Sequence, residues 1–302
     1  MLSWLTGETT SENTTNNFSF PTHPEVTILP EQSSDTPIII DGMLLFSYKE
    51  IMAIREEATN EEDYEVLYEE PENYRRMLVK KKGEGSTGEI KRHKYIRTNF
   101  PCSPKEMFVA VRDFERRKNW DDRLEERNVL RVFSYVDKES GHKVVISIER
   151  TAHKGVFPVQ GRDFISMTGV VQLNEFHYVT LSKALEFRMI PYATTTGVTK
   201  PPPPLPVDKY GPSEGFNGYI RGVNKYFANE CFGNETTTTY TTIVETDVRG
   251  WVPATVYNWF VKFIPAQGEG NLIKGLEWRK TNGVGCDLNE FYYNHDSPLF
   301  KK

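Results

Sequence analysis

The stretch DFISMTGVVQLNEFHYVTLSKAL, residues 163–185, predicts two strands joined by a tight turn at Asn174-Glu175. A similar pair, residues 128–135 and 143–150, precedes it and is joined by a turn at residues 137–141. Five further segments also indicate strands: 64–69, 74–82, 90–100, 219–228 and 236–246. These strands, with long and mostly antiparallel pairing, predict one large sheet.

Helices are expected on either side of these strands. Residues 43–57 carry apolar side chains at helical spacing. Ser103, Pro104 and Glu106 form an N-terminal capping pattern that opens a helix to about residue 114, and a short helix follows near Trp120. A terminal apolar helix opens at Pro253 and is interrupted by residues 265–270. The order predicts an α+β domain with a curved antiparallel sheet of about nine strands around a helix, which would enclose a cavity.

The composition of the chain changes along its length. Residues 1–40 are rich in Thr, Ser, Asn and Pro and predict a disordered leader. Residues 41–280 would form the folded domain, and residues 281–302 a weakly ordered tail. Residues 186–218 read as a long loop insertion whose four consecutive prolines, at 201–204, favour polyproline II.

Composition excludes several classes of function. A net charge of −5 argues against a dominant nucleic-acid function. The three cysteines, Cys102, Cys231 and Cys286, lie far apart, which excludes a disulfide scaffold and a cysteine-built zinc site and indicates a reducing compartment. The six histidines lack metal-ligand spacing, so we expect neither a metal nor a cofactor. No apolar run long enough to span a bilayer and no secretory signal is visible, and we expect a cytoplasmic protein.

Enzyme motifs are scarce as well. Nucleophile elbows, zinc-protease motifs, dinucleotide-binding loops and P-loops are missing, so we expect no enzymatic activity. If an enclosed cavity were catalytic, His153 and Glu149 would be its acid–base pair.

Three short motifs stand in a fixed order: RKNWD at 117–121, HKGVFPVQGRDF at 153–164, and ETDVRGWVPA at 245–254. Together they resemble the START domains, the steroidogenic-acute-regulatory-related lipid-transfer family. That family shows R-x-x-W-D/E after the second helix, R-D-F/Y at the start of a central strand, and D-x-x-G-W-x-P before the terminal helix. The resemblance covers roughly residues 41–280. It implies the helix-grip fold, whose cavity is closed by a C-terminal helix, and it is nearest to the phosphatidylcholine- and ceramide-transfer members.

Arg117 and Asp121 are the first candidates for a binding site. They are four residues apart, so on a helix they share a face and can pair. The pair is either structural or faces the cavity, where an arginine fork suits phosphate and a carboxylate accepts from a hydroxyl or amide. The resemblance implies the second role, because the matching residues contact the lipid head group in those members. It places further head-group ligands at Glu149, Thr151, Ser182 and Thr242.

The resemblance also bears on the choice of lipid. Sterol-binding members have a cavity acid at the position of Glu149 and a basic partner where this chain has Thr168. The loss of that partner favours a phospholipid or a ceramide-like lipid over a sterol. Phe164 matches one aromatic residue of the phosphatidylcholine-binding pattern, and Arg162 with Asp163 would tie the strand start to the preceding loop.

The terminal helix is expected to be the lid of the cavity. Its apolar stripe and its neighbours would line the cavity through Val256, Tyr257, Phe260 and Phe263. By resemblance to the ceramide-transfer member, Phe157 and Trp251 would contact a membrane, with core packing as the alternative.

These features lead to the hypothesis of lipid binding and transfer. One lipid would lie in an apolar tunnel between the curved sheet and the lid and would exchange during transient contact with a membrane surface, to which the protein is peripheral. The alternative is a lipid-sensing interaction module, in which ligand binding changes the exposure of residues 201–204 to an SH3- or WW-type partner.

Overall fold

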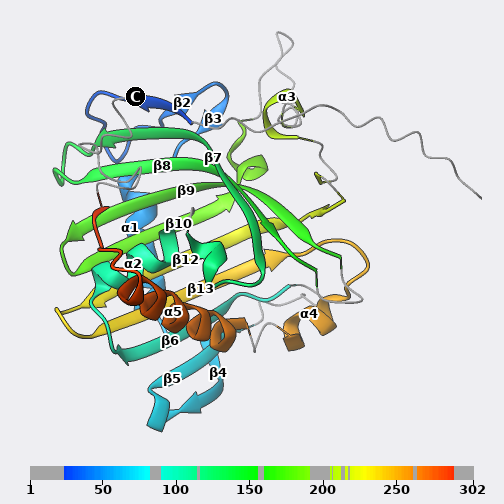
Figure 1. The fold of residues 1–302 in the computed structure, drawn as a ribbon. Coiled ribbons are helices and arrows are strands. Elements are labelled where there is room, and N and C mark those ends of the chain that lie inside the picture. The colour runs from blue at the N-terminus through cyan, green and yellow to red at the C-terminus, as the bar shows by residue number, and fades with distance from the viewer. Residues whose placement is uncertain are drawn as a thin grey trace, which may run out of the picture.

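In the computed structural model of the chain, the described residues are 24–81, 90–113, 116–155, 160–190, 205, 207–211, 215–216, 218–260 and 264–288. One large sheet dominates them (Figure 1). Its strands lie in the order β1-β7-β8-β9-β10-β12-β13-β6-β5-β4, and β11 pairs with β9. The β1–β7 and β11–β9 pairs are parallel, and the other pairs are antiparallel.

The bounds of the sheet strands are β1 (Glu25–Ile28), β4 (Tyr64–Glu70), β5 (Arg75–Lys80), β6 (His93–Phe100), β7 (Leu124–Val136), β8 (Lys143–His153), β9 (Arg162–Asn174), β10 (His177–Ala184), β11 (Ile220–Arg221), β12 (Val223–Gly233) and β13 (Thr238–Asp247). Strands β2 (Ile39–Ile40) and β3 (Met43–Leu44) form a separate small hairpin. Each of the nine strands expected from the sequence overlaps an observed strand, which confirms the α+β architecture.

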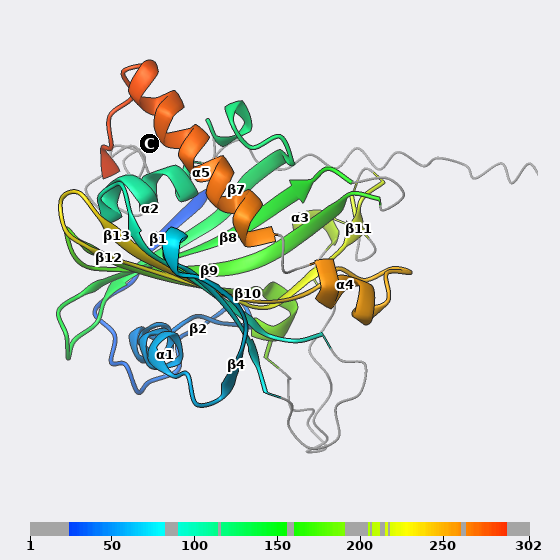
Figure 2. The same ribbon diagram turned by 90° about the horizontal axis from the view of Figure 1, so that it is seen from below.

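Helices cover both faces of the sheet (Figure 2). The outer face is the one covered by α1, and the inner face is the one covered by α2 and α5. The bounds are α1 (Tyr48–Thr59), α2 (Pro104–Arg112), α3 (Val207–Tyr210), α4 (Ala254–Phe260) and α5 (Ile264–Thr281), with the 3-10 turns η1 (Pro71–Asn73), η2 (Arg117–Asn119) and η3 (Leu185–Arg188).

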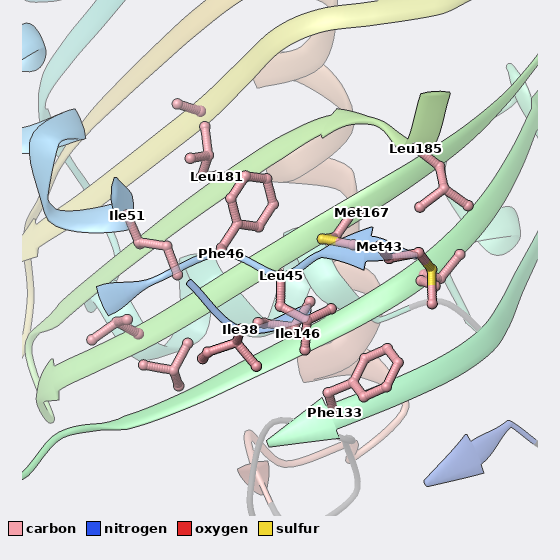
Figure 3. Close-up of a cluster of buried hydrophobic side chains, with 14 of the residues drawn as sticks. Ile38, Met43, Leu45, Phe46, Ile51, Phe133, Ile146, Met167, Leu181 and Leu185 are labelled. Carbon is pink, nitrogen blue, oxygen red and sulfur yellow. The ribbon is translucent and has the colours of Figure 1, made fainter. Parts of the chain in front are cut away.

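The outer face carries the main apolar core. Phe46 and α1 pack on side chains of β7, β8, β9 and β10, a cluster shown in Figure 3. Gly169 of β9 permits this close packing, because a Cβ there would lie 2.7 Å from Cδ1 of Ile51 and 3.1 Å from the ring of Phe46. The helix is therefore held by apolar burial against a sheet position that has no side chain of its own.

Helix α2 begins as its sequence predicts. The Ser103 side chain accepts from the Glu106 N–H at 3.3 Å, and the Glu106 carboxylate accepts from the Ser103 N–H at 2.8 Å, which completes a capping box. Phe108 then stacks on Tyr178 of the inner face, with ring centroids 4.6 Å apart. A second apolar cluster thereby fixes α2 over one end of the inner face.

The N-terminal expectation was wrong in part. Residues 25–28, which fall in the expected leader, form β1 and pair with β7 opposite residues 131–134. Glu25 also pairs with Arg131 at 3.2 Å. Main-chain bonds to an existing sheet edge order this segment despite its polar composition. Helix α1 starts at Tyr48 rather than at residue 43, because Met43 and Leu44 belong to β3.

The C-terminal expectation also needs correction. The sequence predicts one helix from residue 253 with a break at 265–270, whereas α5 runs unbroken from Ile264 to Thr281. Pro265 is tolerated because it lies in the first turn, where its missing N–H would have no partner within the helix. The lid therefore consists of two parts, the short α4 and the longer α5.

Candidate functional site

A cavity of about 460 Å³ lies between the inner face of the sheet and the elements above it. We call the inner-face side chains of β8, β9, β10, β12 and β13 its floor. We call the lining side chains of α2, η2 and α5 its roof. The volume falls within the range of roughly 300–1,000 Å³ typical of small-molecule sites. The floor and roof place residues from distant parts of the chain around one partly open cavity.

Arg117 and Asp121 lie side by side in the roof. Nε and Nη2 of Arg117 are both 2.9 Å from Oδ2 of Asp121, and Nη1 donates to the Val111 carbonyl at 3.0 Å. The other oxygen of Asp121 accepts from the Asn271 amide of α5 at 3.1 Å. The pair therefore links η2 to α5, and it also lines the cavity.

Glu149 lies at the end of the floor that faces α2. One carboxylate oxygen accepts from Arg112 and Ser147, and the other accepts from Arg127 at 2.6 Å. Burial raises the pKa of Glu149, but the charges of Arg112 and Arg127 outweigh it and lower the pKa to about 2. Glu149 is thus ionised and held by two arginines at neutral pH.

His153 lines the cavity at the end of β8. Desolvation lowers its pKa to about 4, and the positive charge of Arg117 adds to this effect. Its ring meets Phe164 edge-on, with centroids 6.0 Å apart. His153 is therefore neutral and Glu149 ionised at pH 7, both far from the near-neutral pKa that suits a general acid or base.

Buried charges tie the lid helix to the sheet. Glu269 of α5 accepts from Nε and Nη2 of Arg75 at 2.9 Å each and from Arg97 at 3.2 Å. Burial raises the pKa of Glu269. The hydrogen bonds from Arg75 and the Tyr95 hydroxyl lower this pKa by more, so the net shift is downward. Farther along α5, Trp278 packs on Trp120 with ring centroids 5.4 Å apart. Gly275 permits this approach, because a Cβ there would lie 2.6 Å from the Trp120 indole nitrogen.

The floor itself is rich in hydroxyl and amide groups. Thr168 donates to Ser182 at 3.1 Å, and Asn224 links Ser166 at 3.2 Å with Thr246 at 3.0 Å. Such groups are stable away from water only when hydrogen-bonded. The floor thus combines these hydrogen-bonded groups with apolar side chains, among them Phe164, Phe227 and Val244.

Most of the expected site residues meet in this one cavity. Besides Arg117, Asp121 and Glu149, its lining includes Thr151, Phe164, Ser182, Thr242 and Tyr257. Phe157 and Phe263 lie outside the described residues, as do the prolines at 201–204, and the Phe260 side chain is also not described.

Val256 was wrongly expected to line the cavity, since its side chain is 52% exposed. Its neighbour Tyr257 is buried and takes the cavity-facing position. Successive residues of a helix point about 100° apart, and the separate α4 is too short to wrap a broad stripe around the cavity. Val256 therefore faces outward.

Trp251 lies in the turn between β13 and α4 and is 64% exposed. Arg162 holds this turn in place. Its Nε donates to the Val248 carbonyl at 2.6 Å, and its Nη2 donates to the Arg249 carbonyl at 3.1 Å. Val248 and Arg162 themselves line the cavity. The exposed tryptophan thus lies next to one end of the cavity.

Several lining residues were missed by sequence reasoning. Arg112 and Arg127 carry ordinary helix and strand patterns, and Glu269 lies in a glycine-flanked segment that reads as a loop. Asn229 is also missed, because β12 contains the polar residues Asn224, Lys225 and Glu230 as well, so polarity alone does not single Asn229 out. Asp163 pairs with Arg221 of β11 at 3.0 Å and with Arg150 of β8 at 3.3 Å, so among the described residues it joins strands and not the strand start to the preceding loop.

The described residues contain neither a membrane-spanning helix nor a cluster of metal ligands. None of the described helices is long and apolar enough to cross a bilayer. No group of three or more His, Cys, Asp or Glu residues in the described ranges could hold a metal ion.

Comparison with known proteins shows the fold of the chain. No family model matches the chain, and no curated protein matches it. The crystal structure of human STARD10 matches with a TM-score of 0.59 at 14% identity, over 88% of this chain and 90% of that one. Human StAR-related lipid transfer protein 5 matches with a TM-score of 0.53 at 14% identity, over 75% of this chain and 92% of that one. The helix-grip fold expected from the sequence is thereby confirmed.

Proposed function

We propose that this chain, which has the fold of StAR-related lipid transfer proteins, binds one lipid in its cavity and exchanges it at membranes. The observation that carries the proposal is the cavity between the sheet and the lid helix, whose roof holds the Arg117–Asp121 pair. Burying an acyl chain stabilises such a complex by about 0.8 kcal/mol per CH₂. Apolar chain and polar head group each find matching surface in the same space.

A phospholipid fits the charges of the lining best. Seven lining residues are basic, Arg97, Arg112, Arg117, Arg123, Arg127, Lys154 and Arg162, whereas three are acidic, Asp121, Glu149 and Glu269. The excess of positive charge favours an anionic group such as phosphate, which arginine binds through its planar fork. In this proposal Arg117 donates to the phosphate, and Asp121 and Asn271 hold it in place. Glu149 keeps Arg112 and Arg127 oriented, and a ceramide-like lipid is the second choice.

Exchange would take place at the α4 end of the cavity. Helix α5 is fixed by Glu269, by Asn271 and by the Trp120–Trp278 contact, whereas the turn before α4 exposes Trp251. An exposed indole favours the interface of a bilayer. We therefore assign Trp251 to membrane contact, with Val256 as an apolar neighbour on the same segment.

The binding claim is tested with Arg117→Ala. Lipids from mixed vesicles are captured by the protein, extracted and identified by mass spectrometry. We expect the wild type to retain a phospholipid and the variant to bind it at least about tenfold more weakly, because a hydrogen bond to a charged group is lost. Arg76→Ala is the matched control, since Arg76 pairs with Glu61 away from the cavity. Equal phospholipid retention by both variants would contradict the role of Arg117, and a captured ceramide would change the lipid class.

The membrane claim is tested with Trp251→Ala in a vesicle-to-vesicle transfer assay. We expect the transfer rate to fall severalfold while the lipid content of the protein stays the same, because the indole acts only at the interface. Phe232→Ala is the matched control, because Phe232 is also an exposed aromatic residue, at 41%, but lies on β12 away from the lining. An unchanged transfer rate in Trp251→Ala would remove Trp251 from the membrane contact.

A further inference from the structure

A row of polar side chains crosses the middle of the cavity floor. Thr180 of β10 stands opposite Asn229 of β12, and Asn229 stands opposite Thr242 of β13. All three line the cavity, and the exposed fractions of Thr180 and Asn229 are only 4% and 5%. The row lies on the sheet floor, whereas Arg117 and Asp121 belong to the roof.

The amide of Asn229 is oriented by its neighbours. Its oxygen accepts from the Tyr240 hydroxyl at 2.8 Å and from the Thr242 hydroxyl at 2.9 Å. The amide nitrogen is left with two N–H donors for which the described residues provide no hydrogen bond, and the Thr180 hydroxyl is in the same position. Both groups belong to side chains more than nine-tenths buried. Both donors are reachable from the cavity, so a bound lipid that excludes water would leave them unpaired unless it accepts from them.

Other polar groups of the floor differ from this pair. Thr168 and Ser182 bond to each other, and Asn224 bonds to both Ser166 and Thr246. Those contacts bridge neighbouring strands, so each of these side chains has at least one hydrogen-bond partner within the floor. The Thr180 side chain has none among the described residues, and it stands directly opposite Asn229, whose N–H₂ group makes no hydrogen bond with them either.

We propose that Asn229 and Thr180 form a second polar subsite, which donates hydrogen bonds to a neutral acyl carbonyl oxygen of the bound lipid. This inference rests on the proposed function. An amide N–H₂ donates only, and a carbonyl oxygen has two lone pairs, so it can accept from Asn229 and Thr180 together. The paired positions of this row, from Val170 through Thr180, Asn229 and Thr242 to Tyr95, contain no charged residue. None of these paired positions supplies a counterion for a phosphate, so a neutral acceptor suits the row itself better.

The carbonyl can come from an ester of a glycerolipid or from the amide of a ceramide-like lipid. The test compares each with an analogue that lacks the carbonyl: a diacyl phospholipid against its diether analogue, and a ceramide against its N-alkyl analogue. Affinities are measured from vesicles of otherwise identical composition. We expect the wild type to prefer the carbonyl-bearing member of at least one pair by about five- to tenfold, as for a neutral hydrogen bond.

The variants assign that preference to the subsite. Thr180→Val and Asn229→Leu should each bring the ratio toward one while binding of the analogue without the carbonyl stays constant. Thr241→Val is the matched control, because Thr241 lies on β13 outside the lining and its change should leave the ratio intact. Asn229→Leu also removes the acceptor of the Tyr240 and Thr242 hydroxyls. If Asn229→Leu fails to fold, Thr180→Val alone decides the test.

The outcomes separate this inference from the function on which it rests. A wild type that binds no member of either pair overturns the proposed function and this subsite with it. Equal binding of both members of each pair overturns the subsite and leaves lipid binding standing. A preference that survives in Thr180→Val and in a folded Asn229→Leu also overturns it.

Discussion

Strand β8 points Ile146 and Ile148 to the outer face of the sheet and Ser147 and Glu149 to the inner face, and all four are buried. Strand β9 repeats the contrast, with Met167 outside and Thr168 inside. Alternation of this kind usually means that the polar face meets water. Here α2 and α5 lie over the inner face (Figure 2), so its polar groups face the cavity beneath them.

The two faces are stabilised by different interactions. The outer face packs against α1 and Phe46 mainly through apolar contact (Figure 3), which favours a single dense arrangement. Ion pairs such as Arg188–Glu50 and Arg92–Glu57 stand at the two ends of the helix. On the inner face, polar side chains form hydrogen bonds and ion pairs with one another, and a cavity remains between floor and roof. A sheet of this kind can stay stable through one face while the other face binds a ligand.

The largest effect on stability is expected from the outer face. Ile146→Ala should lower the free energy of unfolding by about 2–5 kcal/mol, because it leaves a cavity beside Phe46 and Phe133 in a tightly packed region. Thr168→Val on the inner face should cost less than about 1 kcal/mol, since it removes one hydrogen bond to Ser182 at nearly constant volume. Urea unfolding measures both values. Equal costs would show that the two faces do not differ as described.

A somewhat smaller effect is expected from the charges at the end of the floor. Glu149→Gln should lower the free energy of unfolding by about 3 kcal/mol, because it leaves two buried arginines without their shared carboxylate. Glu61→Gln is the control, since its partner Arg76 and Glu61 itself lie at the surface, and its effect should stay below about 1 kcal/mol. If thermal and urea unfolding show the same small change for both variants, the Glu149 cluster is not a stabilising part of the floor.

At neutral pH the smallest effect is expected from His153, which changes only the pH dependence of stability. The pKa of His153 is about 4 in the folded protein against 6.5 when unfolded, so the unfolded chain binds more protons in between. Stability should therefore fall as the pH decreases from about 6.5 to 4, and His153→Gln should flatten that part of the profile. Glu149 adds its own loss only below about pH 4.5, because its pKa falls from 4.5 to about 2 on folding. Equal slopes between pH 4.5 and 6.5 for wild type and variant would contradict the desolvated state of His153.

The sequence predicts elements better than it predicts this contrast. The capping box at Ser103, the long strands and the i,i+4 pairing of Arg117 with Asp121 are local patterns, and each is present in the structure. Contacts across the fold are different, because Glu149 meets Arg112 and Glu269 meets Arg75 only after the sheet and the lid have come together. Asn229 shows the limit most clearly. The sequence shows that Asn229 is polar. Only the register with Thr180 and Thr242 shows that it lies on the cavity floor.

Bound lipid per protein chain tests the central claim most directly. Native mass spectrometry of the purified wild-type protein, after incubation with mixed phospholipid vesicles, measures it without any variant. The account predicts a mass increase equal to one phospholipid on each chain. A protein that stays empty, or one that binds several lipids without a fixed number, would contradict a single ligand held between floor and roof.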